Sequence, residues 1–312
     1  MKTTHHSCLA LCLSIGFLFS STHVMASETP TSSESSLLTY QSATVLRVNP
    51  KGLSQFLLIK APFGLYDSDH EALEKNGITP IVQLQASPAY YKAGVALEFD
   101  PMTILGFRAG VQWQTYNGKF DGLQSFDGTD VNFSDTNLEA LGNDGQGLNY
   151  SASGRIMSLS TTLKAKVGDI ALKHKFGGVR YDMELQNNHE HYYDITLDIL
   201  VENGQWNLTH TTDLVYIHDD SLMVGLRSDY TTPAYSSEGD DLPGSTYRLG
   251  PSVIYNFDPS DDSASASNPN FRNPKLIVML NWWLQHPYRT GEDVSGGVPM
   301  ALVVFTCEGD LL

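Results

Sequence analysis

The feature that most restricts the fold is an alternation of apolar and polar residues with a period of two, repeated from segment to segment. In residues 105–114 (LGFRAGVQWQ), the odd positions are apolar and the even positions are Gly, Arg or Gln. A helix would place apolar residues three and four positions apart. A period of two is that of a β-strand with one apolar and one polar face. The sequence therefore predicts an all-β protein, with Phe107 and Gln112 on opposite faces of one strand.

Twelve segments with this pattern are expected to form strands. Their ranges are 41–48, 53–63, 79–99, 103–116, 153–167, 170–185, 192–203, 205–217, 221–233, 245–257, 274–288 and 299–308. Short connections such as Gly168-Asp169 predict antiparallel hairpins, and Gly177-Gly178 predicts a β-bulge. The longest connection, 117–152, follows the fourth segment, although the long loops of a barrel with both termini on one side follow odd-numbered strands. The expected number is therefore about twelve, with a range of ten to fourteen.

The N-terminal residues have the composition of a targeting segment. Residues 1–26 contain Lys2, an apolar run at 9–20 and a small residue before the expected cleavage point, which predicts a secretory signal peptide. Residues 27–40 are polar and are expected to form a flexible lead, which leaves 41–312 for the barrel. No later stretch reaches 18 apolar residues, so a membrane would be crossed by strands and not by helices.

The distribution of aromatic residues distinguishes a membrane barrel from a soluble β-sandwich. Aromatics lie near the ends of the apolar faces, as Trp206 and Tyr216 do, and such girdles flank the lipid-facing band of outer-membrane barrels. The polar faces are rich in Gly, Ser, Thr and Gln, which suits a wet lumen. The alternative is a soluble β protein with core aromatics at its hairpin ends.

Over its mature length the chain resembles a bacterial outer-membrane β-barrel protein. The resemblance implies a single antiparallel transmembrane β-barrel, exported to the outer membrane of a Gram-negative bacterium. It also implies two partners, the lipid of that membrane and the outer-membrane assembly machinery. The sequence departs from the usual barrel ending, because its last residues are Gly309-Asp310-Leu311-Leu312 and not a terminal aromatic.

Charge further restricts the function. The net charge of −16 excludes an electrostatic nucleic-acid binder, which needs a basic face. On the strands, the polar faces carry charges of both signs that are expected to line the lumen. These residues are Lys92, Glu98, Arg108, Lys164, Lys166, Asp194, Asp198, Asp213, Arg227, Asp229 and Arg248. The predicted wall is close to neutral, and the acidic excess lies in the loops.

Two kinds of chemistry are weighed against simpler interpretations. Asp127, Asp130 and Asp135 provide carboxylates suited to Ca²⁺, but their spacing is not that of an EF-hand, and a solvated loop is the simpler interpretation. His174 and His210 lie within strands, but no Gly-x-Ser-x-Gly motif accompanies them. We therefore expect this protein to have no enzymatic activity and to bind no cofactor.

These observations predict a narrow channel or transporter for small polar solutes. Two alternatives remain at this point: a structural or surface-binding barrel without transport, and an outer-membrane enzyme that acts on lipid or polysaccharide.

Overall fold

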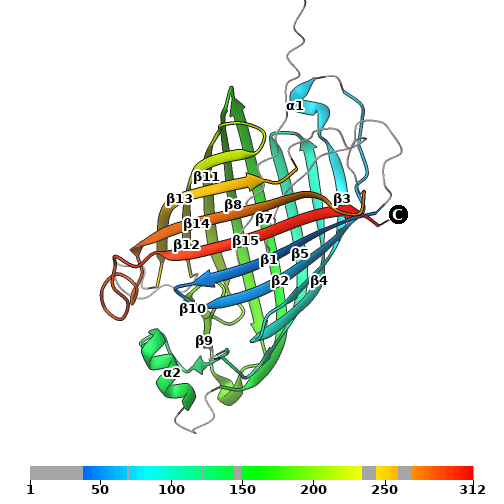
Figure 1. Cartoon of the computed structure of the whole chain (residues 1–312). Coiled ribbons are helices and arrows are strands. Elements are labelled where there is room, and N and C mark those ends of the chain that lie inside the picture. The colour runs from blue at the N-terminus through cyan, green and yellow to red at the C-terminus, as the bar shows by residue number, and fades with distance from the viewer. Residues whose placement is uncertain are drawn as a thin grey trace, which may run out of the picture.

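The computed structural model describes residues 38–68, 70–120, 122–143, 149–233, 244–258 and 269–311. The predicted signal peptide and most of the predicted lead lie outside these residues. The described chain forms a closed antiparallel β-barrel of twelve strands (Figure 1). The barrel strands are β1 (Thr39–Val48), β2 (Gly52–Lys60), β3 (Gly77–Ala86), β4 (Tyr90–Met102), β5 (Leu105–Asn117), β7 (Ser151–Val167), β8 (Ile170–Met183), β11 (Trp206–Ile217), β12 (Leu222–Thr232), β13 (Thr246–Asn256), β14 (Arg272–Gln285) and β15 (Met300–Asp310). The pairing of β1 with β15 closes the barrel.

The connections contain the remaining elements. A separate three-stranded sheet consists of β6 (Ser125–Phe126), β9 (His191–Asp194) and β10 (Ile199–Glu202). The helices are α1 (Glu71–Glu74), α2 (Asp135–Asn143) and the 3₁₀ turn η1 (Gln186–Asn188). Among the described residues, no helix is both long enough and apolar enough to span a bilayer.

The predicted number of strands is right, but two of the predicted strands are wrong. The segment 79–99 contains two strands, β3 and β4, separated by a turn at Ser87-Pro88. The segment 192–203 is not a wall strand, because it forms the β9–β10 hairpin of the small sheet. The two errors cancel in the total. With the corrected strands, the connection 118–150 follows the fifth barrel strand, and the discrepancy in loop order disappears.

The barrel has two distinct ends. The connections 118–150, 184–205 and 286–299 lie at one end, here called the loop end, together with α2 (Figure 1). Both described termini lie at the other end, here called the terminal end, where the Leu311 amide donates to the Leu38 carbonyl. The terminal end also holds α1 and the described ends of the connection between β13 and β14.

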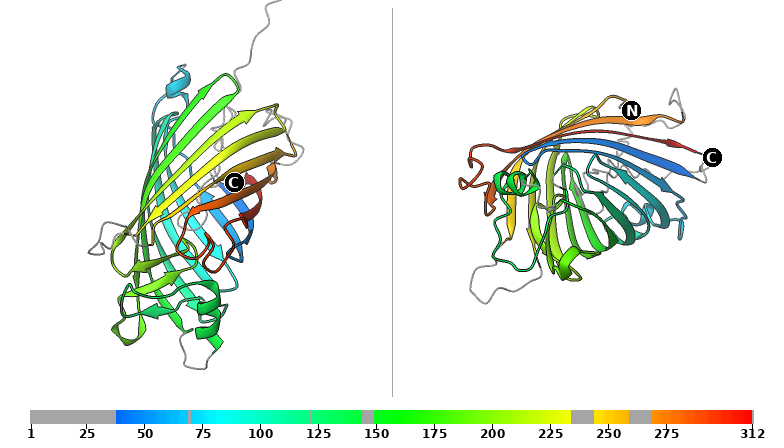
Figure 2. Two further views of the ribbon diagram at one scale, coloured as in Figure 1. Left: turned by 90° about the vertical axis from the view of Figure 1, so that its left-hand side faces the viewer. Right: turned by 90° about the horizontal axis from the view of Figure 1, so that it is seen from below.

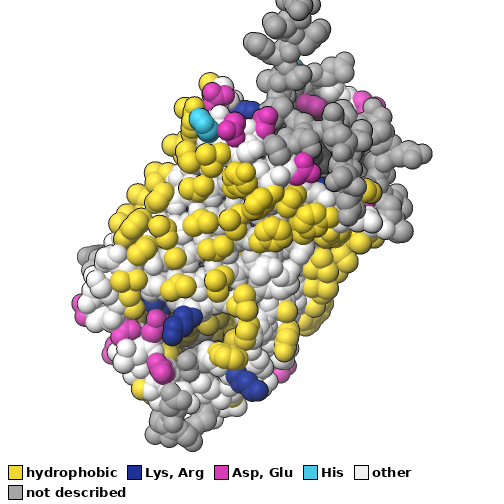
Figure 3. Space-filling view, in the orientation of Figure 1, with side chains coloured by type: hydrophobic (Ala, Val, Ile, Leu, Met, Phe, Trp, Pro, Cys, Tyr) yellow, Lys and Arg dark blue, Asp and Glu magenta, His cyan; other side chains and the backbone are white. Residues whose placement is uncertain are grey.

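The outer surface is mainly apolar. On β5, Phe107 is exposed and Gln112 is buried inside the barrel, as the alternation predicts. Apolar side chains cover the middle of the face shown in Figure 3, and charged side chains gather towards its ends. On β4, Tyr91 and Phe99 flank exposed Val95 and Leu97. A closed barrel with an apolar belt between aromatic residues is a transmembrane β-barrel.

The predicted bulge at Gly177-Gly178 is wrong. Both glycines keep regular pairing with β7 and β11, and Gly178 instead makes room for the ring of Trp206, which would lie 3.1 Å from a Cβ at that position. Irregular pairing occurs elsewhere, between Phe99 and Met102, between Tyr247 and Arg248, and between Arg272 and Lys275.

Candidate functional site: the barrel interior and its closed mouth

Charged side chains cross the inside of the barrel because every second residue of each strand points inward. On one side of the interior, Arg108 of β5 donates to Glu98 of β4 at 3.2 Å and also to the side chain of Gln83. A cavity of about 20 Å³ lies beside this pair, with room for roughly one water molecule. Lys173 and Lys175 of β8 also line the cavity. The Lys173 ammonium is buried and has no hydrogen-bond partner among the described residues.

A second group of interior charges lies on β11, β12 and β13. Arg227 donates to Asp229 at 3.0 Å and to Asp213 at 3.4 Å, and all three side chains are buried. Arg248 lies 3.8 Å from the Asp229 carboxylate, and its guanidinium stacks 4.8 Å from the ring centre of Trp283. These contacts join the strands through paired charges, which tolerate burial better than isolated ones.

The balance of these charges differs from the predicted near-neutral wall. Among the described residues, the buried charged side chains of the barrel strands are mainly basic. The basic ones are Arg47, Lys92, Arg108, Lys173, Lys175 and Arg227, and the acidic ones are Glu98, Asp213 and Asp229. Arg248, whose side chain is 12% exposed, adds a seventh positive charge. The sequence interpretation missed Arg47, Lys173 and Lys175, although Lys173 and Lys175 follow the alternation of their strand.

Part of the interior is apolar and not wet. A cluster of buried hydrophobic side chains lines the inner faces of β1, β2 and β11 to β15. Its members are Ala43, Val45, Phe56, Val215, Met223, Ile254, Ile277, Met279, Leu302 and Val304. The interior charges are closed to solvent too, since Arg227 is 1% and Asp213 2% exposed. The described conformation is therefore closed at these charges.

Asp194 and Asp198, predicted as wall charges, lie in the β9–β10 hairpin and not on the barrel wall. The Asp194 carboxylate accepts backbone hydrogen bonds from Thr196 at 3.0 Å and Leu197 at 2.7 Å, and Asp198 has a positive φ of 59°. A carboxylate that caps the backbone two residues further on forms a turn. This turn reverses the chain inside a run that alternates from Tyr193 to Ile199.

The hairpin closes the mouth of the barrel at the loop end. Its Tyr192, Leu197, Ile199 and Val201 belong to one buried cluster with wall residues that include Tyr116, Ile156 and Tyr181. Arg47 of β1 donates to the Ile195 carbonyl at 2.7 Å, and Tyr116 of β5 donates to Asp194 at 3.2 Å. The right view of Figure 2 looks at this end from below, with α2 beside the opening. The plug is formed by 184–205, and 118–150 covers it through Phe133 and Leu138, which pack with Tyr193 and Leu200.

A buried ion pair fastens the hairpin to the connection 286–299. Arg289 donates to Asp198 through Nε at 2.6 Å and Nη2 at 3.0 Å, and to Asp135 at 2.7 and 2.8 Å. Tyr193 donates to Asp198 at 2.6 Å, and His286 Nε2 lies 3.3 Å from that carboxylate. We call Asp198, Arg289 and Asp135 the latch. Burial opposes the charge of Asp198, but Arg289 and His286 outweigh it and hold the pKa well below its usual value.

The other predicted residues lie at the rims. Lys164 is half-buried and Lys166 is exposed, both near the terminal end of β7. Asp127 and Asp130 are exposed in the connection before α2, whereas the Asp135 carboxylate belongs to the latch. Within the described ranges, no group of three or more His, Cys, Asp or Glu side chains is arranged to hold a metal ion.

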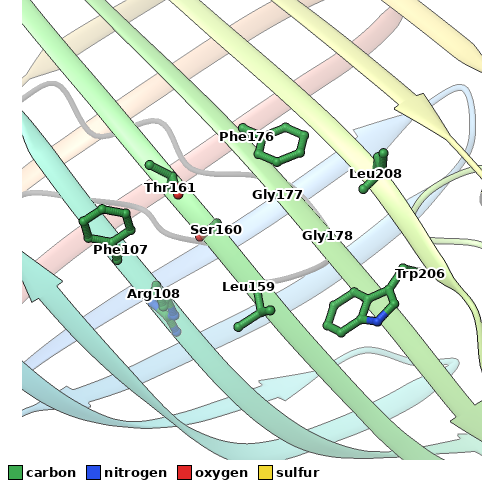
Figure 4. A pocket seen from close by; sticks show the side chains of 10 residues that line it. All are labelled: Phe107, Arg108, Leu159, Ser160, Thr161, Phe176, Gly177, Gly178, Trp206 and Leu208. Atoms are coloured by element: carbon green, nitrogen blue, oxygen red, sulfur yellow. The ribbon is translucent and has the colours of Figure 1, made fainter.

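The outer wall carries an apolar groove of about 360 Å³. Phe107, Leu159, Phe176, Trp206 and Leu208 point towards the viewer in Figure 4, and Arg108 lies behind the wall. We call this the outer groove. The strand histidines His174 and His210 also lie on the outer face, beside Phe176.

No protein-family model matches the chain, and no curated protein matches its sequence. Among solved structures, the chain is similar to the KdgM porin, with a TM-score of 0.41, 8% identity and coverage of 88% of this chain and 99% of that chain. It is also similar to the NanC porin, with a TM-score of 0.39, 8% identity and coverage of 87% and 100%. The translocator domain of the autotransporter NalP from Neisseria meningitidis gives a TM-score of 0.40, 9% identity and coverage of 89% and 90%. Scores below 0.5 establish neither a common family nor a shared solute.

Proposed function

We propose that this protein is a channel in the outer membrane of a Gram-negative bacterium, that it passes small polar solutes with a preference for anions, and that the described conformation is closed. The observation that carries the proposal is the excess of buried basic side chains on the barrel strands, six against three acidic ones among the described residues. This excess contrasts with the net charge of −16 for the whole chain. Rings of Lys and Arg favour the passage of anions.

The plug places two carboxylates against this basic wall. Asp194 interacts electrostatically with Lys92, and Asp198 with Arg47 and Arg248. In the closed mouth, the hairpin carboxylates therefore occupy positions where the wall would attract an anionic solute. Movement of the hairpin would leave these basic groups facing water and small anions.

Buried apolar side chains of the plug and the latch together hold the closed position. Each fully buried apolar side chain contributes about 1.5–3 kcal/mol. Removing one partner of a buried ion pair costs about 3–5 kcal/mol, which is enough to change how often the mouth opens.

Planar-bilayer recordings test the proposal. Arg289→Ala removes the centre of the latch, and Arg155→Ala is the control because its ion pair with Asp182 is exposed. We expect small, infrequent and anion-selective currents from the wild-type protein, a large increase in open time for Arg289→Ala, and no change for Arg155→Ala. Cation-selective currents would contradict the proposed preference.

One observation favours a second candidate function. The central charges are almost completely buried, as they would be in a structural barrel whose lumen is filled. If neither the wild-type protein nor Arg289→Ala conducts after correct insertion, the structural role replaces the channel.

A further inference from the structure

A patch of polar side chains interrupts the lipid-facing surface of β8, β11, β12 and β13. Thr212 pairs with His174 on one side and with Ser228 on the other, and Tyr230 pairs with His210 and with Tyr247. Cross-strand partners project from the same face of a sheet, so these side chains form one continuous surface. We call it the outer polar patch, with the members His174, His210, Thr212, Ser228, Tyr230 and Tyr247.

The patch lies in the middle of the apolar band. On β11, the outward positions run from Trp206 to Tyr216, the two aromatic residues expected at the membrane interfaces. Leu208 and Leu214 are 40% and 46% exposed, and His210 and Thr212 lie between them. These two polar residues are therefore at the depth where the bilayer is most apolar.

Hydrocarbon cannot satisfy these groups. His174 Nδ1 and the Thr212 hydroxyl share a hydrogen bond of 2.9 Å. The His210 ring lies beside the rings of His174, Phe176 and Tyr230, and no hydrogen bond to its imidazole is found among the described residues. Lipid tails offer no donors or acceptors, and ionisable residues within a membrane segment generally mark a functional contact.

We propose that the outer polar patch is the contact surface for a second copy of this chain. Two copies inserted in the same direction are related by a two-fold axis along the membrane normal, and such an axis keeps every residue at its own depth. An axis that passes beside the patch brings it against the same patch of the other copy at the same depth. Imidazoles and hydroxyls can both donate and accept, so the patch is complementary to itself. The outer groove adjoins the outer polar patch, because Phe176 lines the groove and also lies beside His210. The groove offers the second copy an apolar recess.

Disulfide trapping in native outer membranes tests the contact. Thr212→Cys is placed in a Cys307→Ser background, since Cys307 is the single cysteine among the described residues. We expect oxidation to give a covalent species of twice the monomer mass. The control is Val82→Cys, because Val82 is exposed on β3 at the far side of the barrel. The oxidised control protein should stay monomeric. If the cysteine at position 212 traps a species of any other mass, the partner is a different protein and the proposal is wrong.

A second pair of measurements keeps folding and contact separate. His210→Leu combined with Thr212→Val removes polar groups from the lipid face, so barrel assembly should persist and can be checked by heat-modifiable gel mobility. We expect the dimer mass of the wild-type protein, measured by light scattering in detergent, to fall to the monomer mass in the variant. A folded variant that stays dimeric overturns the proposal, and so does a wild-type protein that is monomeric in detergent and is not trapped in membranes. Both readouts are masses, so they do not depend on whether the protein conducts.

Discussion

Arg289 and Asp198 are joined by two hydrogen bonds, from Nε at 2.6 Å and from Nη2 at 3.0 Å, although 91 residues separate them along the chain. Asp198 belongs to the plug hairpin, and Arg289 to the connection between the last two barrel strands. The same guanidinium holds Asp135 at the start of α2. One buried cation therefore fastens three separate loops across the mouth of the barrel.

The latch should withstand mild acid. Because the pKa of Asp198 in the folded protein lies well below 3.8, the ion pair contributes fully above the unfolded value of about 3.9 and is lost as the pH falls through the folded pKa. We expect wild-type open times in planar bilayers to be the same at neutral pH and at about pH 5, and to rise only in strong acid. Asp198→Asn should raise them at neutral pH and remove the acid response. Opening of the wild-type channel between neutral pH and pH 5 would show that another group controls the mouth.

A charge on the outer surface should cost more at the centre of the bilayer than at its edge. Val95 lies midway between Tyr91 and Phe99 on β4, and its side chain is exposed. Val95→Arg should destabilise the inserted barrel by about 2–4 kcal/mol, and Phe99→Arg on the same strand by about 0–1 kcal/mol. Urea unfolding in lipid vesicles measures both. Equal costs would show that β4 does not span the membrane at this depth.

Because β13 packs closely against β14, a side chain at Gly250 should destabilise the barrel. A Cβ at this position would lie 1.8 Å from the Leu280 carbonyl oxygen, so the strands would have to separate. Overpacking of this kind costs about 1–3 kcal/mol, and Gly250→Ala should reduce the yield of heat-modifiable barrel. Gly64→Ala is the matched control, because no atom lies within 4 Å of its Cβ position. Normal assembly of both variants would contradict this packing.

Alternation predicted the barrel and its faces because a strand between lipid and interior must change environment at every residue. It failed where local chemistry reverses the chain without breaking the pattern. The Asp194 carboxylate caps its own turn, so 192–203 alternates like a wall strand and yet folds back as β9–β10. In 79–99 the turn residues Ser87 and Pro88 separate two strands that were predicted as one.

The site was only partly predictable. Lys173 and Lys175 occupy inward positions of β8, and the alternation of that strand could have predicted them as interior charges. The latch was not, because its members are 91 and 154 residues apart and their contact depends on how three loops fold over the mouth. The sequence pattern also gives no measure of how tightly the lumen is filled, which depends on side chains meeting across the barrel.

The buried lysines of the basic wall should set the ion selectivity of the proposed channel. Lys173 and Lys175 are buried, whereas Lys164, the cross-strand partner of Lys173, is half-buried and Lys166 is exposed. Water and salt screen the more exposed lysines over a Debye length of about 8 Å, and they screen buried charges much less. Lys173→Gln with Lys175→Gln, in the Arg289→Ala background that holds the mouth open, should lower the anion-to-cation permeability ratio on the order of tenfold, equivalent to ~1.4 kcal/mol. Lys164→Gln with Lys166→Gln in the same background should shift it in the same direction but by less. Reversal potentials in a salt gradient give both ratios, and an equal shift from the two pairs would show that the buried lysines are not the selective part of the path.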